Sequence, residues 1–148
     1  GGVMLDPMRA LVADAAIPDV IFHGRQPRES MPVFFAKADV LLLSLDAPFS
    51  LTLPGKFQAY LKAGRAIFGI LKGAAAELIE KHGLGATADP ERIETIVDGF
   101  HALQVKASNG ELSACRKECL AFSEAMFKRD RLIANLATRI GSWETDCK

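Results

Sequence analysis

Residues suited to binding an anion follow the short apolar segments of this sequence. Arg25 and Lys56 carry positive charge, and Gly73 precedes three consecutive alanines. Backbone N–H groups in the first turn of a helix have no partner inside the helix, so they attract phosphates and carboxylates. Lys56 is expected in such a turn, where a cation opposes the helix dipole and gains no local stability. These residues predict a site for a phosphate or diphosphate.

Neighbouring residues are suited to contacting the same ligand. Gly24 permits a backbone turn and the close approach of a ligand. Gln58 is able to hydrogen-bond a ribose or sugar hydroxyl. The small residues Gly73 and Ala74 leave the free amides of the next helix accessible to a diphosphate.

Each polar candidate also has a plainer interpretation, which the sequence leaves open. Lys56 and Gln58 are equally compatible with solvated surface side chains, and Arg25 taken alone fits a surface arginine in a loop better than a ligand contact. Glu77 is expected one turn into a helix, where its charge favours the helix dipole without any ligand.

Alternating helices and strands are expected to position these residues. Strands are expected over residues 20–23, 39–44, 66–70 and 83–87. Helices are expected over residues 6–16, 30–38, 54–63, 73–81, 89–105 and 111–140, the last with an interruption near Phe122 and Ser123. Asp-Pro pairs are typical helix starts, and a glycine such as Gly64 is a typical stop.

The alternation with short connections predicts an α/β fold, in which a parallel sheet carries helices on both faces. Residues 39–44 are apolar except at the ends, a pattern typical of a strand buried on both faces. Right-handed crossovers make this a doubly wound sheet. In such sheets ligands bind beyond the carboxyl ends of the strands, where the candidate residues are expected.

The overall composition is that of one globular domain. The chain has 148 residues, 49% of them hydrophobic, and 18 basic residues balance 18 acidic ones. A neutral chain without a basic stripe is not expected to bind nucleic acid. None of His23, His82 and His101 has an acidic partner at a spacing that suggests a catalytic base, so the catalytic residues stay unknown.

The three cysteines, Cys115, Cys119 and Cys147, do not predict a disulfide framework, because their number is odd and all lie near the C-terminus. Cys115 and Cys119 are spaced for one helix face. No histidine or further cysteine lies near enough in sequence to complete a zinc site. We therefore expect half-buried thiols in a reducing compartment, with no metal and no cofactor.

Secretion and membrane signals are not recognisable in the sequence. The N-terminus lacks a basic segment followed by an apolar core, and the apolar run 40–43 is far shorter than the roughly 20 residues that span a bilayer. Gly1-Gly2 leads directly into an expected helix, which suggests a cut through a longer chain. The expected location is the cytoplasm, with the inner face of the membrane left open.

Four segments resemble the C-terminal domain of family 4 glycosyltransferases. Val-Ile-Phe-His-Gly at 20–24 is similar to the family's V-x-F-x-G strand, and residues 31–40 resemble its segment ending in Ala-Asp-Val. Leu-Pro-Gly-Lys-Phe-Gln-Ala-Tyr-Leu-Lys-Ala-Gly at 53–64 is similar to v-P-S-K-l-q-t-Y-m-A-A-G, and 73–85 matches a segment bounded by two glycines. The third segment is the most specific and points to the subgroup that builds O-antigen, capsule or exopolysaccharide.

The resemblance implies the Rossmann-like half of a GT-B enzyme. Residues 1–148 would be its donor-binding domain, truncated at the N-terminus, and 109–148 its C-terminal helical tail. In the family this domain binds a nucleotide-diphosphate sugar such as a UDP- or GDP-sugar. The enzyme transfers the sugar to a polysaccharide or lipid-linked acceptor, usually with retention of configuration and without a metal. The implied donor-binding residues are Gly24, Arg25, Pro54, Lys56, Gln58, Ala59, Gly73, Ala74 and Glu77.

This sequence departs from the family pattern at the donor site. Many members carry two glutamates eight positions apart, where this chain has Leu51 and Ala59, and Gly55 replaces a common serine. The family's diphosphate-binding arginine and lysine usually precede the first residue of this chain. The acceptor domain, through which such enzymes usually contact a membrane, is missing as well. We therefore expect the fragment alone to be inactive in glycosyl transfer.

Two other interpretations share the same sheet. One is a non-catalytic Rossmann-like module that binds a nucleotide or docks a partner. The other is a flavodoxin-like or epimerase-related domain. The epimerase that acts on UDP-N-acetylglucosamine has the same GT-B halves, but its acidic and histidine catalytic residues are not recognisable here.

Overall fold

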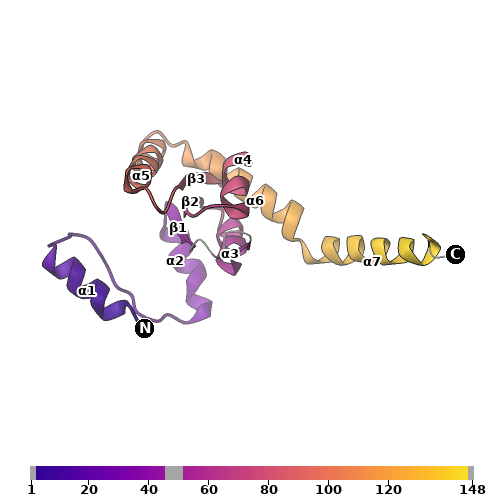
Figure 1. Ribbon diagram of the computed structural model, residues 1–148, viewed down its shortest axis with the longest axis horizontal. Coiled ribbons are helices and arrows are strands. Elements are labelled where there is room, and N and C mark those ends of the chain that lie inside the picture. Colours follow the sequence, from indigo (N-terminus) through magenta and orange to yellow (C-terminus); the bar gives the residue numbers. More distant parts are fainter. Residues whose placement is uncertain (1–2, 46–51, 147–148) are drawn as a thin grey trace. The chain divides into compact units, whose positions relative to one another are not determined.

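The computed structural model describes residues 3–45 and 52–146. The chain divides into two compact units, residues 1–34 and 35–148, which are described separately. Figure 1 shows the elements of both.

The first unit contains one long helix, α1 (Leu5–Asp14), and one turn of 3-10 helix (Arg28–Ser30). Helix α2 (Met31–Lys37) leads from this unit into the second. The helix expected over residues 6–16 is thus confirmed within two residues.

The strand expected over residues 20–23 is not formed, so that prediction is wrong. A β-strand is defined by hydrogen bonds to a neighbouring strand. Residues with high β-propensity favour an extended backbone but do not supply that neighbour. Among the described residues, every strand pairing belongs to the sheet of the second unit.

The second unit is built on a parallel three-stranded sheet in the order β1-β2-β3. Its strands are β1 (Val40–Ser44), β2 (Ala66–Ile70) and β3 (Gly85–Ala88). The chain returns to the start of each next strand through a helix, which is the connection that parallel pairing requires. The expected strand over 66–70 is confirmed residue for residue, and the other two begin one or two residues later than expected.

Helices cover both faces of this sheet, as predicted (Figure 1). Helices α3 (Gly55–Ala63) and α4 (Ala74–Lys81) pack on one face, in a cluster that joins Phe57, Ile79 and Leu43. Helix α5 (Ile93–Ser108) packs on the other face, where Leu103 meets Phe68 of β2. The architecture is therefore α/β and consistent with a Rossmann-like fold.

Two further helices complete the second unit, α6 (Leu112–Phe127) and α7 (Arg129–Asp146). The interruption expected near Phe122 and Ser123 lies instead at Lys128, which has extended backbone angles. Phe122 and Ser123 are buried, and Phe122 packs into the same core cluster as α3 and α4. A helix continues where its side chains are held by such packing, so the break moves to the first residues beyond the core.

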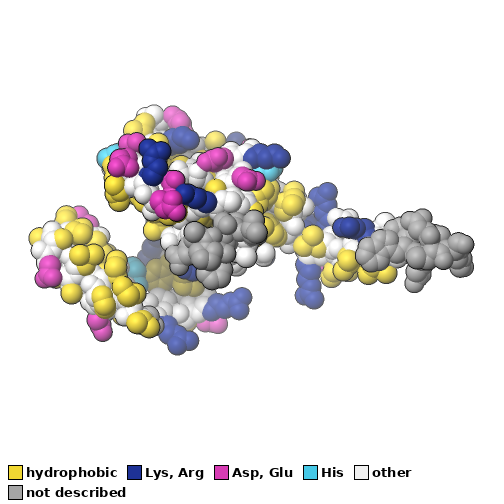
Figure 2. Space-filling model, viewed as in Figure 1, with side chains coloured by type: hydrophobic (Ala, Val, Ile, Leu, Met, Phe, Trp, Pro, Cys, Tyr) yellow, Lys and Arg dark blue, Asp and Glu magenta, His cyan; other side chains and the backbone are white. Residues whose placement is uncertain are grey.

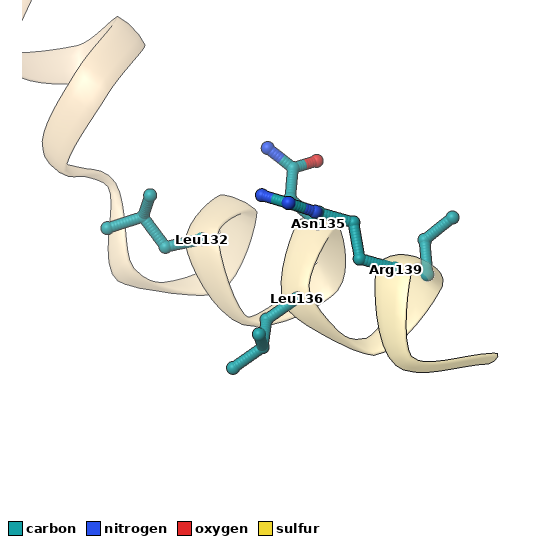
Figure 3. Close-up of a pocket in the computed structure, with 5 residues that line it drawn as sticks. Leu132, Asn135, Leu136 and Arg139 are labelled. Atoms are coloured by element: carbon teal, nitrogen blue, oxygen red, sulfur yellow. The ribbon is translucent and has the colours of Figure 1, made fainter. Parts of the chain in front are cut away.

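Helix α7 presents hydrophobic side chains to solvent over residues 132–140 (Figure 2). Leu132, Ile133, Leu136 and Ile140 are each about half exposed. Figure 3 shows a hollow lined by Leu132, Asn135, Leu136 and Arg139, all from this one helix. A hollow with walls from a single helix is an open surface and encloses no ligand.

Two cysteines of α6 are buried, more deeply than the half-buried thiols expected. Cys119 is 0% exposed, and its thiol donates to the backbone carbonyl oxygens of Arg65 and Leu84 at 3.4 and 3.7 Å. Cys115 belongs to the cluster on the α5 face, whereas Cys119 belongs to the cluster on the α3 face. Both thiols therefore act as small packing groups between α6 and the sheet. Cys147 lies outside the described residues.

Burial raises the pKa of the Cys119 thiol to about 12 from an ordinary value of 9.0. The folded chain thus keeps this proton at a pH where the unfolded chain has lost it. The stability contribution is complete below pH 9 and is lost as the pH rises toward 12. Because of Cys119, we expect the free energy of unfolding to fall by roughly 2 kcal/mol as the pH rises from 8 to 10.5. Urea unfolding at both pH values, in the wild type and in Cys119→Ala, measures this, and an equal loss in the two proteins would contradict it.

Candidate functional site

The carboxyl ends of the strands form one row at one edge of the sheet. Ser44 pairs with Ile70, and Ile70 pairs with Ala88. Two backbone bonds extend the row by one residue: Leu45 donates its N–H to Ile70 at 3.3 Å, and Leu71 donates its N–H to Ala88 at 3.2 Å. The loops that begin here, after β1, β2 and β3, therefore start side by side.

Helix α3 begins close to this edge. Its nine residues rise about 14 Å, which is about the length of a five-residue strand, and it ends at Gly64 just before β2 starts. A helix that ends at the amino edge of the sheet after this length must begin at the carboxyl edge. Pro54 is the residue before its first turn, and it provides no side-chain hydrogen bond to that turn. The Phe57 N–H bonds to the Pro54 carbonyl oxygen at 2.8 Å.

The predicted contacts on α3 point away from the core. Phe57 is fully buried and fixes the helix on the sheet. Its neighbours Lys56, Gln58 and Ala59 are exposed. Lys56 is thus an exposed cation in the first turn of the helix.

Helix α4 begins directly at the same edge, three residues after the end of β2. The residue before it, Gly73, has φ 83° and ψ −150°, a backbone conformation that is essentially restricted to glycine. Its carbonyl oxygen accepts the first helical bond, from the Glu77 N–H at 3.1 Å. Gly73 likewise provides no side-chain hydrogen bond to this helix. Ala74 is half-buried, and the Glu77 side chain is exposed.

The starts of α3 and α4 therefore lie at the same edge and over the same face of the sheet. Both helices pack in one hydrophobic cluster, which includes Phe57 and Ala75 from their first turns. Each presents first-turn N–H groups that receive no side-chain cap from the preceding residue, Pro54 or Gly73. Together the two ends make a region of positive electrostatic potential that suits a group with several anionic oxygens.

An ion-pair cluster next to α4 is a feature that sequence reasoning missed. Lys72 Nζ lies 2.9 Å from Asp89 Oδ1 and 3.0 Å from Glu91 Oε2. It joins the loop after β2 to the loop after β3. The sequence pattern that indicates this cluster is a lysine after one expected strand and an Asp-x-Glu sequence after the next.

The same cluster shifts the pKa values of its members. A hydrogen bond from the Glu91 N–H, followed by that from Lys72, lowers the pKa of the Asp89 carboxyl. Hydrogen bonds to Asp89 and Glu91 raise the pKa of the Lys72 ammonium. Both groups thus stay charged near neutral pH, and Lys72 is engaged by carboxylates beside the first turn of α4. The stabilisation from Asp89 is lost as the pH falls through its lowered pKa.

Gly24 and Arg25 belong to the first unit, so their geometry is described without reference to Lys56 or Gly73. Gly24 has φ 68°, which agrees with the backbone turn expected there. Arg25 is exposed in a bend. The Gln26 side chain closes this turn by donating to the His23 carbonyl oxygen at 2.6 Å.

Within residues 3–45 and 52–146, no group of three or more His, Cys, Asp or Glu side chains is placed to hold a metal ion. In the same part of the chain, no helix has the length and hydrophobicity to cross a bilayer. Residues 46–51, which include Leu51 of the family's first glutamate position, lie outside the described residues.

A hydrophobic groove lies on the opposite face of the sheet. It has a volume of about 370 Å³ and lies between β1, β2 and α5, with Leu42, Phe68 and Phe100 among its lining residues. Neither Lys56 nor Gly73 contributes to it. In the described part of the chain, the candidate anion site is therefore separate from this groove and consists of the backbone amides at the starts of α3 and α4.

Comparison with known proteins gives no identification. No protein-family model matches the chain, and neither a curated protein nor a solved structure is significantly similar to it.

Proposed function

We propose that this chain binds the diphosphate of a nucleotide sugar, as the donor-binding half of a GT-B glycosyltransferase. The observation that carries this proposal is the common position of two helix starts, at one edge and over one face of a parallel sheet, where neither Pro54 nor Gly73 provides a side-chain cap. Ligands of α/β proteins bind at this edge. Gly73 adds a backbone conformation that brings the α4 amides within reach of a ligand.

The chemistry that this arrangement supports is the departure of a nucleoside diphosphate. In glycosyl transfer the bond between the sugar and the diphosphate breaks, and negative charge grows on the phosphate oxygens. Fixed N–H groups and the Lys56 ammonium would stabilise that charge without a metal ion. We place UDP- and GDP-sugars first among the ligands, and a polysaccharide or lipid-linked sugar as the acceptor in the cytoplasm.

The proposal includes a doubly wound sheet and a second domain that carries the acceptor site. A GT-B enzyme works between two such domains, so the 148 residues alone are expected to bind a donor without transferring its sugar. Binding is expected to be weak, because the basic residues that usually grip the diphosphate are not among those at this edge.

A second candidate function is a non-catalytic docking module. The exposed hydrophobic side chains of α7, namely Leu132, Ile133, Leu136 and Ile140, favour it, because hydrophobic faces of this kind often mark protein contacts. This function requires no nucleotide at the strand ends, so ligand titration separates the two candidates.

The first test is calorimetric titration of the chain with UDP and GDP. Lys56→Ala is expected to weaken binding at least tenfold, because a charge-assisted hydrogen bond contributes about 1.5–3 kcal/mol. Lys62→Ala is the matched control. Lys62 is also exposed on α3, but it lies in the last turn, at the opposite end of the helix from Lys56.

Two results would count against the proposed function. One is the absence of measurable heat with either nucleotide at millimolar concentration. The other is an equal loss of affinity in Lys56→Ala and Lys62→Ala, which would show a nonspecific effect of charge.

A further inference from the structure

A hollow of about 560 Å³ lies where α3, α6 and α7 meet. Its walls belong entirely to the second unit. Lys62 contributes from the last turn of α3, at the opposite end of that helix from Lys56. The end of α6 and the start of α7 supply the other lining residues, namely Leu120, Ser123, Glu124, Phe127, Lys128 and Arg129. The hollow is therefore separate from the candidate diphosphate site.

The hydroxyl group of Ser123 lacks the local bond that other helical serines make. Ser108, for example, donates its hydroxyl to the Gln104 carbonyl oxygen at 3.1 Å. Ser123 is only 7% exposed, yet in the described part of the chain no hydrogen bond joins its hydroxyl to another residue. Buried polar groups are normally hydrogen-bonded. Because Ser123 lines the hollow, its hydroxyl is a donor available to a ligand there.

Positive charge surrounds this hydroxyl. Lys62, Lys128 and Arg129 are all exposed at the hollow. The lining carboxylate of Glu124 lies 3.3 Å from Lys128 Nζ, so these two charges compensate each other. Within the described residues, neither Lys62 nor Arg129 has a carboxylate partner. The hollow thus keeps two cations that its own carboxylate does not neutralise.

The start of α7 adds backbone donors. Lys128 has extended backbone angles, and its carbonyl oxygen accepts the first helical bond of α7, from the Leu132 N–H at 3.1 Å. The N–H groups of residues 129–131 precede that bond, so no carbonyl oxygen of the helix is available to them. They form the positive end of the helix dipole. Asp130 lies in the same turn but is not a lining residue.

We propose that this hollow binds the phosphate group of a small organic molecule. The oxygens of a phosphate match the donors present here, which are an ammonium, a guanidinium, a hydroxyl and backbone amides. A volume of about 560 Å³ is within the roughly 300–1,000 Å³ of small-molecule sites and exceeds what one phosphate fills. Leu120 and Phe127 offer apolar walls to the organic part. A soluble phosphate ester and a lipid headgroup share this chemistry.

The test is an NMR titration of the isotope-labelled chain with inorganic phosphate and with phenyl phosphate, at constant ionic strength. Amide shifts are expected at Lys62 and over residues 123–131. Phenyl phosphate should bind more tightly, because its ring lies on the apolar walls. Arg129→Ala is expected to weaken binding about tenfold or more, since hydrogen bonds between charged groups are strong. Arg131→Ala is the matched control, because Arg131 is an exposed arginine of the same helix outside the hollow.

Ser123→Ala separates a ligand contact from a structural role. A hydroxyl that bonds to no described residue adds little to stability, so the urea midpoint of unfolding should stay unchanged. Phosphate affinity should fall about fivefold, the effect of one lost hydrogen bond. A lower midpoint with unchanged phosphate affinity would show that the hydroxyl is structural and would overturn the proposal.

Dihexanoyl phosphatidic acid distinguishes the two sources of the phosphate. Tighter binding than that of phenyl phosphate would indicate a lipid headgroup, and weaker binding a soluble ester. The proposal is overturned if phosphate at millimolar concentration shifts no amide within residues 123–131, or if Arg129→Ala and Arg131→Ala lose affinity equally. Lys56→Ala should leave these shifts unchanged. The nucleotide titrations concern the other end of α3, so this inference and the proposed function fail separately.

Discussion

Replacing Gly85 with alanine is expected to unfold the second unit or to separate β3 from its sheet. A Cβ atom at Gly85 would lie 1.9 Å from the Ile67 carbonyl oxygen and 2.7 Å from the Ile67 backbone nitrogen. These are backbone atoms of the paired strand β2, so they cannot move aside without breaking the ladder. We expect a loss of about 3 kcal/mol or more in the free energy of unfolding, the upper range of overpacking effects.

Gly69→Ala is the matched control for this prediction. It places a Cβ in the same sheet, 2.9 Å from the Cδ1 atom of Ile79. That atom is the end of a side chain that can change rotamer, so a cost of only about 1–2 kcal/mol is expected. Urea denaturation followed by circular dichroism measures both variants. Equal losses in Gly69→Ala and Gly85→Ala would show that the backbone contact at Ile67 is not the limiting one.

Replacing Gly73 with alanine is expected to affect both stability and ligand binding. An alanine at φ 83° and ψ −150° costs about 1–3 kcal/mol of unfolding free energy, or it forces the loop into another conformation. Either response disturbs the first-turn amides of α4. If these amides hold a diphosphate, the affinity for UDP or GDP should fall at least tenfold, measured by calorimetry on the folded variant.

Gly64→Ala is the control that separates the effect of Gly73→Ala on stability from its effect on ligand binding. Gly64 also has a positive φ, 62°, but it ends α3 at the opposite edge of the sheet. Alanine there is strained as well, and its Cβ would lie 3.2 Å from side-chain atoms of Arg116 and Leu120. It should therefore destabilise the fold while leaving nucleotide affinity unchanged. A parallel fall in affinity for both variants would mean that the loss at Gly73 reflects stability alone.

The elements that form the edge of the sheet could be predicted because their signals are local. Residues 66–70 are a β-rich run between Gly64 and Gly73, and they form β2 as expected. Pro54 and Gly64 bound α3 because proline suits a helix start and glycine a helix end.

The candidate site could be predicted only in part. The glycine conformation at 73 and the exposure of Lys56 follow from residue type and position in a helix. The ion pairs of Lys72 with Asp89 and Glu91 join two loops that are separated in sequence. Local sequence patterns do not predict how close two such loops lie in space. The roles of all nine predicted donor-binding residues remain predictions, and the titrations above test two of them, Lys56 and Gly73.

What the amino-acid sequence determined by itself was the identity of the local elements and the glycines and prolines that bound them. Tertiary structure decided which elements acquire partners. Residues 20–23 and 40–44 have similar β-rich sequences, yet only the second segment joins a ladder, and Leu42 within it stays 55% exposed. Burial and pairing are properties of two surfaces in contact, so one segment's residues cannot specify them alone.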